Sequence, residues 1–154
     1  SSIRPLEGID LADEVIKQAG DNPLCFFLHS KVNTIREEAK RTIDMLNQGH
    51  KYFTIRYSGE PIINQLIHYY GDPSFKDKIL LAGNFFAYHR SAISLMQEWF
   101  NEIIQWSLKD QISLPYVLYK SGFKYSIFEG YTNIKNQYFT WEWRKREKSL
   151  IKKI

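Results

Sequence analysis

Residues 83–122 read GNFFAYHRSAISLMQEWFNEIIQWSLKDQISLPYVLYKSG, and this stretch sets the fold class that the sequence predicts. A strand-like run over residues 84–88 leads through a polar turn, residues 89–91, into a strongly apolar helix. The compact polar residues 109–111 follow that helix. Two elements that bury heavily are therefore separated by polar groups, as is typical of a scaffold that presents a site.

The long helix of this stretch is expected to be mostly buried, with Ser91 as its N-cap. Apolar residues at helical spacing form one stripe along it, namely Ala92, Met96, Trp99, Ile103 and Trp106. Three further apolar residues widen this stripe: Ile93, Phe100 and Ile104. Because Pro115 interrupts a helix interior, two alternatives stay open for the segment after this helix. Either a short turn around residues 108–112 precedes a helix from about residue 113, or one kinked helix continues; Gly122 ends both.

The chain upstream alternates between predicted helices and an apolar strand. Residues 1–9 look like a tether, and Asp10 can cap a helix over residues 11–19. Residues 24–28, LCFFL, have the continuous apolar pattern of a strand buried on both faces. A helix is expected over residues 34–48, and its charged residues 36–38, 40 and 41 are most simply a solvated face.

Beyond Gly49 the pattern is weaker. Residues 51–57 predict a short strand or an irregular connection, and Pro61 suits the first turn of a helix that runs to about residue 70. A second strand is predicted over residues 79–88, with Gly83 and Asn84 marking a bulge or a close backbone approach. Residues 123–128 alternate as a third strand, and residues 129–137 are polar and loop-like.

Strands that alternate with helices predict an α/β class, with a small mixed sheet and helices packed on it. The expected organisation is one domain over residues 1–138, followed by a basic, aromatic helix or tail over residues 139–154. Basic residues outnumber acidic ones in that tail, although the whole chain carries a net charge of only +4. The body is thus near neutral, which argues against a DNA-binding face spread over the fold.

The bulk properties are those of a globular protein. The chain has 154 residues, of which 44% are hydrophobic and 25% charged. A single cysteine, Cys25, excludes an intrachain disulfide and suits a reducing compartment, and its apolar neighbours predict that it is buried. No signal peptide is visible, and no apolar run approaches the roughly 20 residues that span a bilayer. The expected location is the cytoplasm.

Several standard catalytic motifs are absent from the sequence. It contains no GxGxxG or Walker-type loop, no Cys/His set at zinc spacing and no GxSxG element. It also lacks Asp-x-Asp, the pair that commonly holds a divalent metal against a diphosphate. No metal ligand is therefore predicted within the chain.

Polar residues instead stand at the ends of apolar elements. His29 follows the first strand, and His89 with Arg90 follows the second. If the two strands are parallel, both histidines line one crevice at the carboxyl ends of the strands. Lys109, Asp110 and Gln111 follow the long helix; Asp110 also lies three residues after Ser107, so that a capping box is an equally good interpretation of it.

Taken in order, these pieces resemble a glycosyltransferase-like family found in plants, bacteria and viruses, long catalogued only as a domain of unknown function. The resemblance rests on NFFAYHRS, EWFNEI and KDQISLPYVL, together with FFLHSKVNTIREEA and YSGEP upstream. It covers roughly residues 24–128. It implies a GT-A-like fold and the transfer of a sugar from a nucleotide-sugar donor to a hydroxyl of a glycan or protein acceptor.

The resemblance also implies roles for particular residues. Asp110 would accept a proton from the acceptor hydroxyl or hold that hydroxyl in line. Arg90, Lys109 or a histidine would stabilise charge on the leaving diphosphate. The remaining substrate-binding candidates are Gln111, His29, His89 and Asn84, with Trp106 as a sugar-stacking ring if it is not core.

Two departures from the family pattern stand out. Lys109 replaces the usual Arg before Asp-Gln, which loses a bidentate fork. The half of the family fold that binds the nucleotide, with its acidic motif for Mn²⁺ or Mg²⁺, has no counterpart here. The sequence therefore resembles the acceptor-side half, either as part of a longer protein or as a reduced member. Such a half is expected to expose an apolar edge and to form a homodimer or bind another chain.

Two rival functions remain open at this point. The first is a module that keeps the fold and binds carbohydrate or protein without turnover. The second makes the basic tail the working part, in peripheral contact with an anionic membrane or with RNA.

Overall fold

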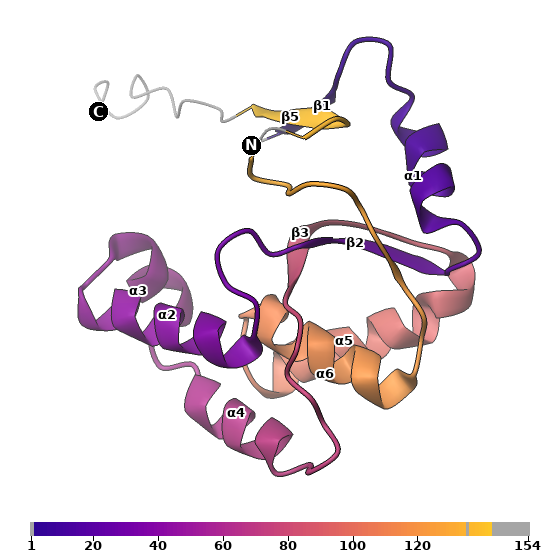
Figure 1. Cartoon of the computed structure of the whole chain (residues 1–154). Helices are drawn as coiled ribbons and strands as arrows, with labels where there is room; N and C mark the ends of the chain where they lie inside the picture. The colour runs from indigo at the N-terminus through magenta and orange to yellow at the C-terminus, as the bar shows by residue number, and fades with distance from the viewer. Residues whose placement is uncertain (1, 135, 143–154) are drawn as a thin grey trace, which may run out of the picture.

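The computed structural model describes residues 2–134 and 136–142 of the chain, and it confirms a mixed α/β class with small sheets and packed helices (Figure 1). The strands are β1 (Ser2–Pro5), β2 (Leu24–Leu28), β3 (Leu81–Tyr88), β4 (Ser126–Ile127) and β5 (Phe139–Glu142). The helices are α1 (Leu11–Ala19), α2 (Ile35–Asn47), α3 (Lys51–Tyr57), α4 (Ile62–Tyr70), α5 (Ile93–Gln105) and α6 (Asp110–Ser121), with a 3₁₀ turn, η1 (Arg90–Ala92), before α5.

The central sheet has the strand order β3-β2-β4. Strand β2 pairs antiparallel with β3 and parallel with β4, so the sheet is mixed. As its sequence predicts, β2 is buried on both faces. Alternate residues of the strand meet different layers: Leu24 and Phe26 face a cluster built by α5 and α6, which lie under the sheet in Figure 1.

The opposite face of the sheet is covered by α1 and by the β1–β5 pair (Figure 1). Phe27 packs there against Phe128, with ring centroids 4.7 Å apart, and against Phe139. The tether expected over residues 1–9 is therefore wrong, because β1 pairs with β5 in an antiparallel ladder. The helix expected from about residue 139 is also wrong over residues 139–142, which form β5; residues 143–154 lie outside the described part of the chain.

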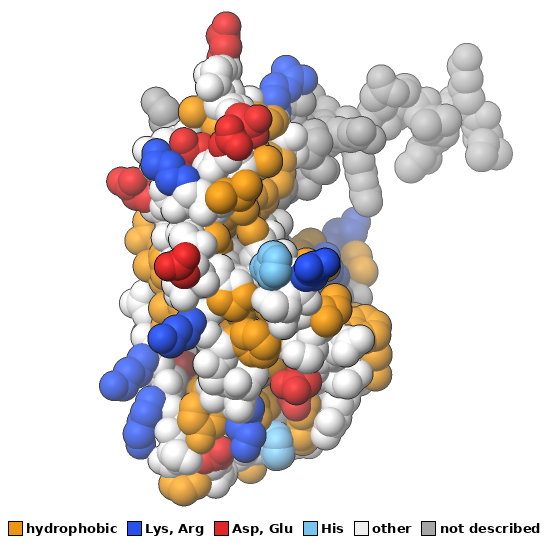
Figure 2. Space-filling view, turned by 90° about the vertical axis from the view of Figure 1, so that its right-hand side faces the viewer, with side chains coloured by type: hydrophobic (Ala, Val, Ile, Leu, Met, Phe, Trp, Pro, Cys, Tyr) orange, Lys and Arg blue, Asp and Glu red, His pale blue; other side chains and the backbone are white. Residues whose placement is uncertain are grey.

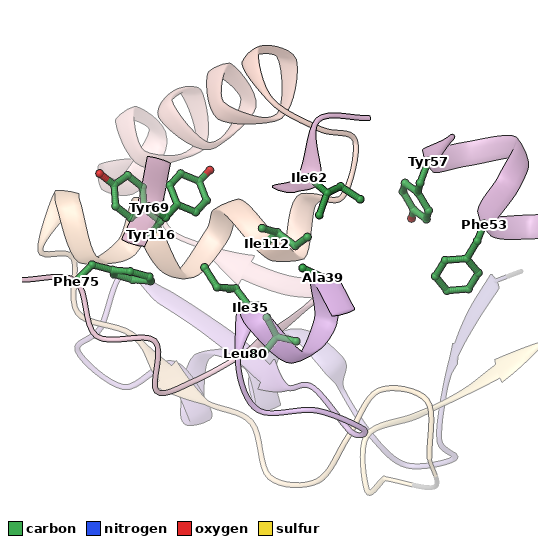
Figure 3. Packing of buried hydrophobic residues seen from close by; sticks show 10 residues of the cluster. All are labelled: Ile35, Ala39, Phe53, Tyr57, Ile62, Tyr69, Phe75, Leu80, Ile112 and Tyr116. Atoms are coloured by element: carbon green, nitrogen blue, oxygen red, sulfur yellow. The ribbon is translucent and has the colours of Figure 1, made fainter. Parts of the chain in front are cut away.

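A third cluster joins α2, α3, α4 and α6 (Figure 3). Tyr69 of α4 stacks on Tyr116 of α6 with centroids 4.1 Å apart, and Ile112 faces α2. The strand or irregular connection predicted over residues 51–57 is wrong, since this segment is α3. Phe53 and Tyr57 stand one turn apart on that helix and both are buried.

Three further predictions differ from the structure. Helix α6 begins at Asp110, earlier than the expected start near residue 113, and it contains Pro115. Strands β3 and β4 are shorter than the predicted runs over residues 79–88 and 123–128. On α5 the residues expected to widen the buried stripe are instead exposed, because no described element covers that side of the helix; they are Ile93, Phe100 and Ile104.

Cys25 is buried, as predicted, and burial raises the pKa of its thiol to about 12. None of the helices in the described part of the chain is both long enough and apolar enough to cross a bilayer.

Candidate functional site

A charged cluster lies where the loop after β2, helix α2 and the start of α6 come together. We call it the Glu38 cluster, and it comprises His29, Glu38, Arg41, Lys109 and Asp110. Its parts come from segments far apart in the sequence. Two of these segments, the histidine after the first strand and the Lys109–Gln111 turn, are among those that the sequence singled out.

Glu38 is the centre of the cluster. Its side chain is fully buried on α2, yet three basic side chains approach its carboxylate. The Lys109 Nζ atom lies 2.6 Å from Oε1, the Arg41 guanidinium lies 3.2 Å from the same oxygen, and His29 Nε2 lies 3.9 Å from Oε2. A buried carboxylate needs such partners, because burial of an unpaired charge is costly.

Lys109 ties the connection between α5 and α6 to the rest of the cluster. Its ammonium group also donates to Gln111 Oε1 at 3.0 Å. The Nζ atom lies 5.2 Å from the centre of the Tyr57 ring, which permits a cation–π contact with α3. Lys109 and Gln111 thus contact each other, and the lysine is bound within the protein.

Asp110 opens α6 and packs against β3. Its Oδ1 accepts the Gln111 backbone N–H at 3.0 Å, and a Cβ atom added to Gly83 would lie only 2.6 Å from Oδ2. The close approach and the bulge predicted near Gly83 are both confirmed. Phe26 of β2 pairs with Phe86 of β3, whereas the next residue, Phe27, pairs with Ala82, so residues 83–85 bulge out of the ladder. Glycine permits the contact because it has no side chain.

Burial raises the pKa of the Asp110 carboxyl above its ordinary value, while the positive charge of Lys109 acts in the opposite direction. The capping-box interpretation of Asp110 is wrong. Ser107 donates its hydroxyl hydrogen to Gln65 Oε1 at 2.7 Å and makes no cap for the following helix. The Asp110 carbonyl is held in place by the Trp99 indole N–H, at 3.0 Å.

His29 stands at the edge of the cluster, directly after β2. Its Nδ1 accepts the backbone N–H groups of Lys31 and Val32, which assigns the proton of the neutral ring to Nε2, on the side of Glu38. Burial lowers the pKa of His29, and the Glu38 carboxylate opposes this effect.

The prediction that His29 and His89 line one crevice is wrong. Because β2 and β3 are antiparallel, their carboxyl ends point to opposite ends of the sheet. The His89 backbone N–H bonds to the carbonyl of Pro23, next to the start of β2, so His89 and the exposed Arg90 lie far from the Glu38 cluster. The shared crevice was predicted only for parallel strands, and the α/β pattern of the sequence carries no information on strand direction.

Asn84 and Trp106 also make their contacts elsewhere. Asn84 is an exposed residue of the bulge, and its Oδ1 accepts the Thr132 hydroxyl at 2.9 Å. Trp106 stacks on the His68 ring of α4, with centroids 5.0 Å apart. Within the described residues its buried indole Nε1 has no hydrogen-bond partner.

The sequence interpretation missed Glu38 and Arg41, which were assigned to a solvated face of α2. That assignment is wrong for Glu38. The available signal was its position: Glu38 lies between Ile35 and Thr42 on the buried stripe of α2, where a charged residue requires a partner.

The described residues do not fit a divalent metal. They contain no group of three His, Cys, Asp or Glu side chains that could hold one, and Glu38 is already occupied by cationic side chains. Five cavities in this part of the chain lie elsewhere, with neither Asp110 nor Gln111 in their lining. Comparison of the chain with protein-family models, with curated proteins and with solved structures finds no match.

Proposed function

We propose that this chain is a glycosyltransferase domain of GT-A type, which transfers a sugar from a nucleotide-sugar donor to a hydroxyl of a glycan or protein acceptor in the cytoplasm. One observation carries the proposal. The segment Lys109–Gln111 packs against Gly83 and, through Lys109, against Glu38 of α2. Two pieces of the family resemblance, FFLHSKVNTIREEA and KDQISLPYVL, therefore contribute to one charged site.

The chemistry proposed for this site assigns the proton transfer to Asp110. The acceptor oxygen would form a bond to the anomeric carbon as the bond to the diphosphate breaks, and Asp110 would take the hydroxyl proton. A carboxylate whose pKa is raised by burial is a better base than an exposed one. Lys109 would supply positive charge near the leaving group, in place of the distant Arg90, and the neutral His29 ring could donate a hydrogen bond from Nε2.

The direct test is transfer by the full chain with a panel of nucleotide sugars, in the presence of Mn²⁺ or Mg²⁺. Asp110→Asn is expected to lower turnover by at least about 100-fold, the lower end of the effect of a positioned acid or base. Asp44→Asn is the matched control, because Asp44 is a carboxylate on α2 that forms a surface pair with Lys40. Unchanged turnover in Asp110→Asn would remove Asp110 from the mechanism.

A second candidate is a module that binds carbohydrate or protein without turnover. It is favoured by the full engagement of Lys109 with Glu38 and Gln111. Calorimetric titration with the same donors separates the two functions. No heat with any nucleotide sugar would favour the module.

The basic tail remains a separate proposal, because residues 143–154 lie outside the described part of the chain. Contact with an anionic membrane predicts that deletion of residues 143–154 lowers retention on vesicles containing phosphatidylserine. Retention equal to that of the full chain would contradict it. The proposed homodimer is tested by sedimentation of the intact chain.

A further inference from the structure

A cavity of about 460 Å³ lies at the end of the sheet opposite the Glu38 cluster. It is bounded by the last turns of α1, the turn before β2 and the junction of β3 with η1. Figure 2 faces this side of the molecule, where apolar side chains are interspersed with scattered charged side chains and histidines. The volume falls in the range of about 300–1,000 Å³ that is usual for small-molecule sites.

The cavity combines an apolar lining with an aromatic rim. Val15 and Ala19 contribute aliphatic surface. Tyr88 is 49% exposed and Ile16 is 68% exposed, so both can contact a bound molecule. A tyrosine in this position offers a flat apolar face together with a hydroxyl group.

Several polar groups of the lining are available to a ligand. Within the described residues, the Asp21 carboxylate and the Tyr88 hydroxyl have no hydrogen-bond partner. His89 Nδ1 accepts the Ser91 backbone N–H, so the neutral ring carries its proton on Nε2 and can donate it. Acceptors and donors are therefore both present, around an apolar floor.

The charges of the lining restrict the class of ligand. Among the described residues that line the cavity there is one carboxylate, Asp21, and no Lys or Arg. A phosphate, a nucleotide or an acidic sugar would thus meet one like charge and no Lys or Arg in the lining; the exposed Arg90 stands between His89 and Ser91 but does not line the cavity.

We propose that this cavity binds a neutral sugar unit of a glycan chain, apart from transfer at Asp110. The C–H face of a pyranose ring matches Tyr88 and the aliphatic floor, while its hydroxyls both donate and accept. The choice of a glycan rests on the proposed function, whereas the preference for a neutral, hydroxyl-rich ligand rests on the lining itself.

The test uses the full chain labelled with ¹⁵N and neutral trisaccharides of glucose, mannose, galactose, xylose or N-acetylglucosamine, each at about 10 mM so that a millimolar site is well occupied. At least one is expected to shift the amide signals of Ile16 and Tyr88. Trigalacturonic acid, the anionic probe, is expected to bind at least threefold more weakly. No shift with any neutral probe, or shifts confined to residues 109–111, would overturn the proposal.

Variants assign the contact to the cavity. Tyr88→Ala is expected to weaken binding at least tenfold, while Tyr88→Phe keeps the ring and should stay within about threefold of the parent. Tyr52→Ala is the matched control, since Tyr52 on α3 is 51% exposed and does not line the cavity. Equal weakening by Tyr52→Ala would overturn the assignment. Asp110→Asn should bind as the parent does, so loss of transfer and loss of this binding are distinguishable.

Discussion

Glu38 and Lys109 form a pair whose two side chains are 0% and 8% exposed. Removal of one partner from a buried ion pair typically costs about 3–5 kcal/mol, because the other charge is left uncompensated. Glu38→Gln is expected to lower the free energy of unfolding by an amount in that range, since it removes the counter-charge of Lys109. Lys109→Met should cost less, because Glu38 keeps Arg41. Urea unfolding of both variants measures the difference.

The double variant tests the coupling of the pair. In the Glu38→Gln background, Lys109→Met is expected to restore part of the lost free energy of unfolding, because it removes the unpaired charge. Asp44→Asn, which breaks the exposed Lys40–Asp44 pair, is the control and should cost less than about 1 kcal/mol. Additive effects of the two buried substitutions would contradict the pairing.

The burial of Asp110 predicts how the stability of the protein depends on pH. Burial raises its pKa in the folded state, so the folded protein holds this proton to a higher pH than the unfolded chain does. Ionisation of Asp110 therefore lowers stability, a loss that is absent below its ordinary pKa of 3.8 and complete above the raised value. Asp110→Asn should gain stability relative to the parent as the pH rises from about 3 to about 7.

Urea unfolding of the two proteins across this pH range measures the effect. The Asn side chain keeps an acceptor for the Gln111 N–H, so this hydrogen bond does not distinguish them. A stability difference that is flat, or that shrinks as the pH rises, would contradict the buried carboxylate.

Helix α2 is the element that presents Glu38, and its start is held from outside as well as from within. Thr34 and Glu37 form a capping box. Asp77, in the loop before β3, accepts the backbone N–H groups of Ile35 and Arg36 and the hydroxyl hydrogen of Tyr70. The first turn of α2 is thereby anchored to two other parts of the chain.

Asp77→Ala is expected to cost about 2 kcal/mol, because it leaves the start of α2 without its external acceptor. The rate of amide hydrogen exchange in the first turn of α2 should also increase in this variant. Lys78→Ala, in the same loop, is the control; Lys78 is exposed and the change should stay within about 0.5 kcal/mol. Equal effects of the two substitutions would show that Asp77 does not hold α2.

At the scale of the whole molecule, the two ends of the described chain close one layer of the fold. Strand β1 pairs with β5, and Ile3 packs against the cluster that covers Phe27. Ile3→Lys is expected to lower the free energy of unfolding by about 1–3 kcal/mol, since a charge replaces a partly buried apolar side chain. Glu7→Lys introduces the same residue at an exposed position nearby and should change stability by less than about 0.5 kcal/mol. A similar cost for both would contradict a packed β1.

Some elements of the structure were predictable from the sequence, and others were not. The apolar runs around Phe26 and Trp99 and the Asp10 cap of α1 were predictable, because hydrophobic period and capping residues are local properties. Segment 51–57 was not: its Phe and Tyr residues suit a strand by propensity, and only burial against α2 makes it helical. The bulge at Gly83 was predictable from the glycine, but its contact with Asp110 was not.

The amino-acid sequence by itself determined the α/β class and the buried strand β2, and it singled out the polar residues Lys109–Gln111, since each depends on neighbours along the chain. Only the tertiary structure decided that His29 lies near these residues while His89 does not, because the direction of β3 relative to β2 is a long-range property. It also decided that Glu38 is central, since a carboxylate on a helix can be solvated or buried, and partners from distant segments make the difference.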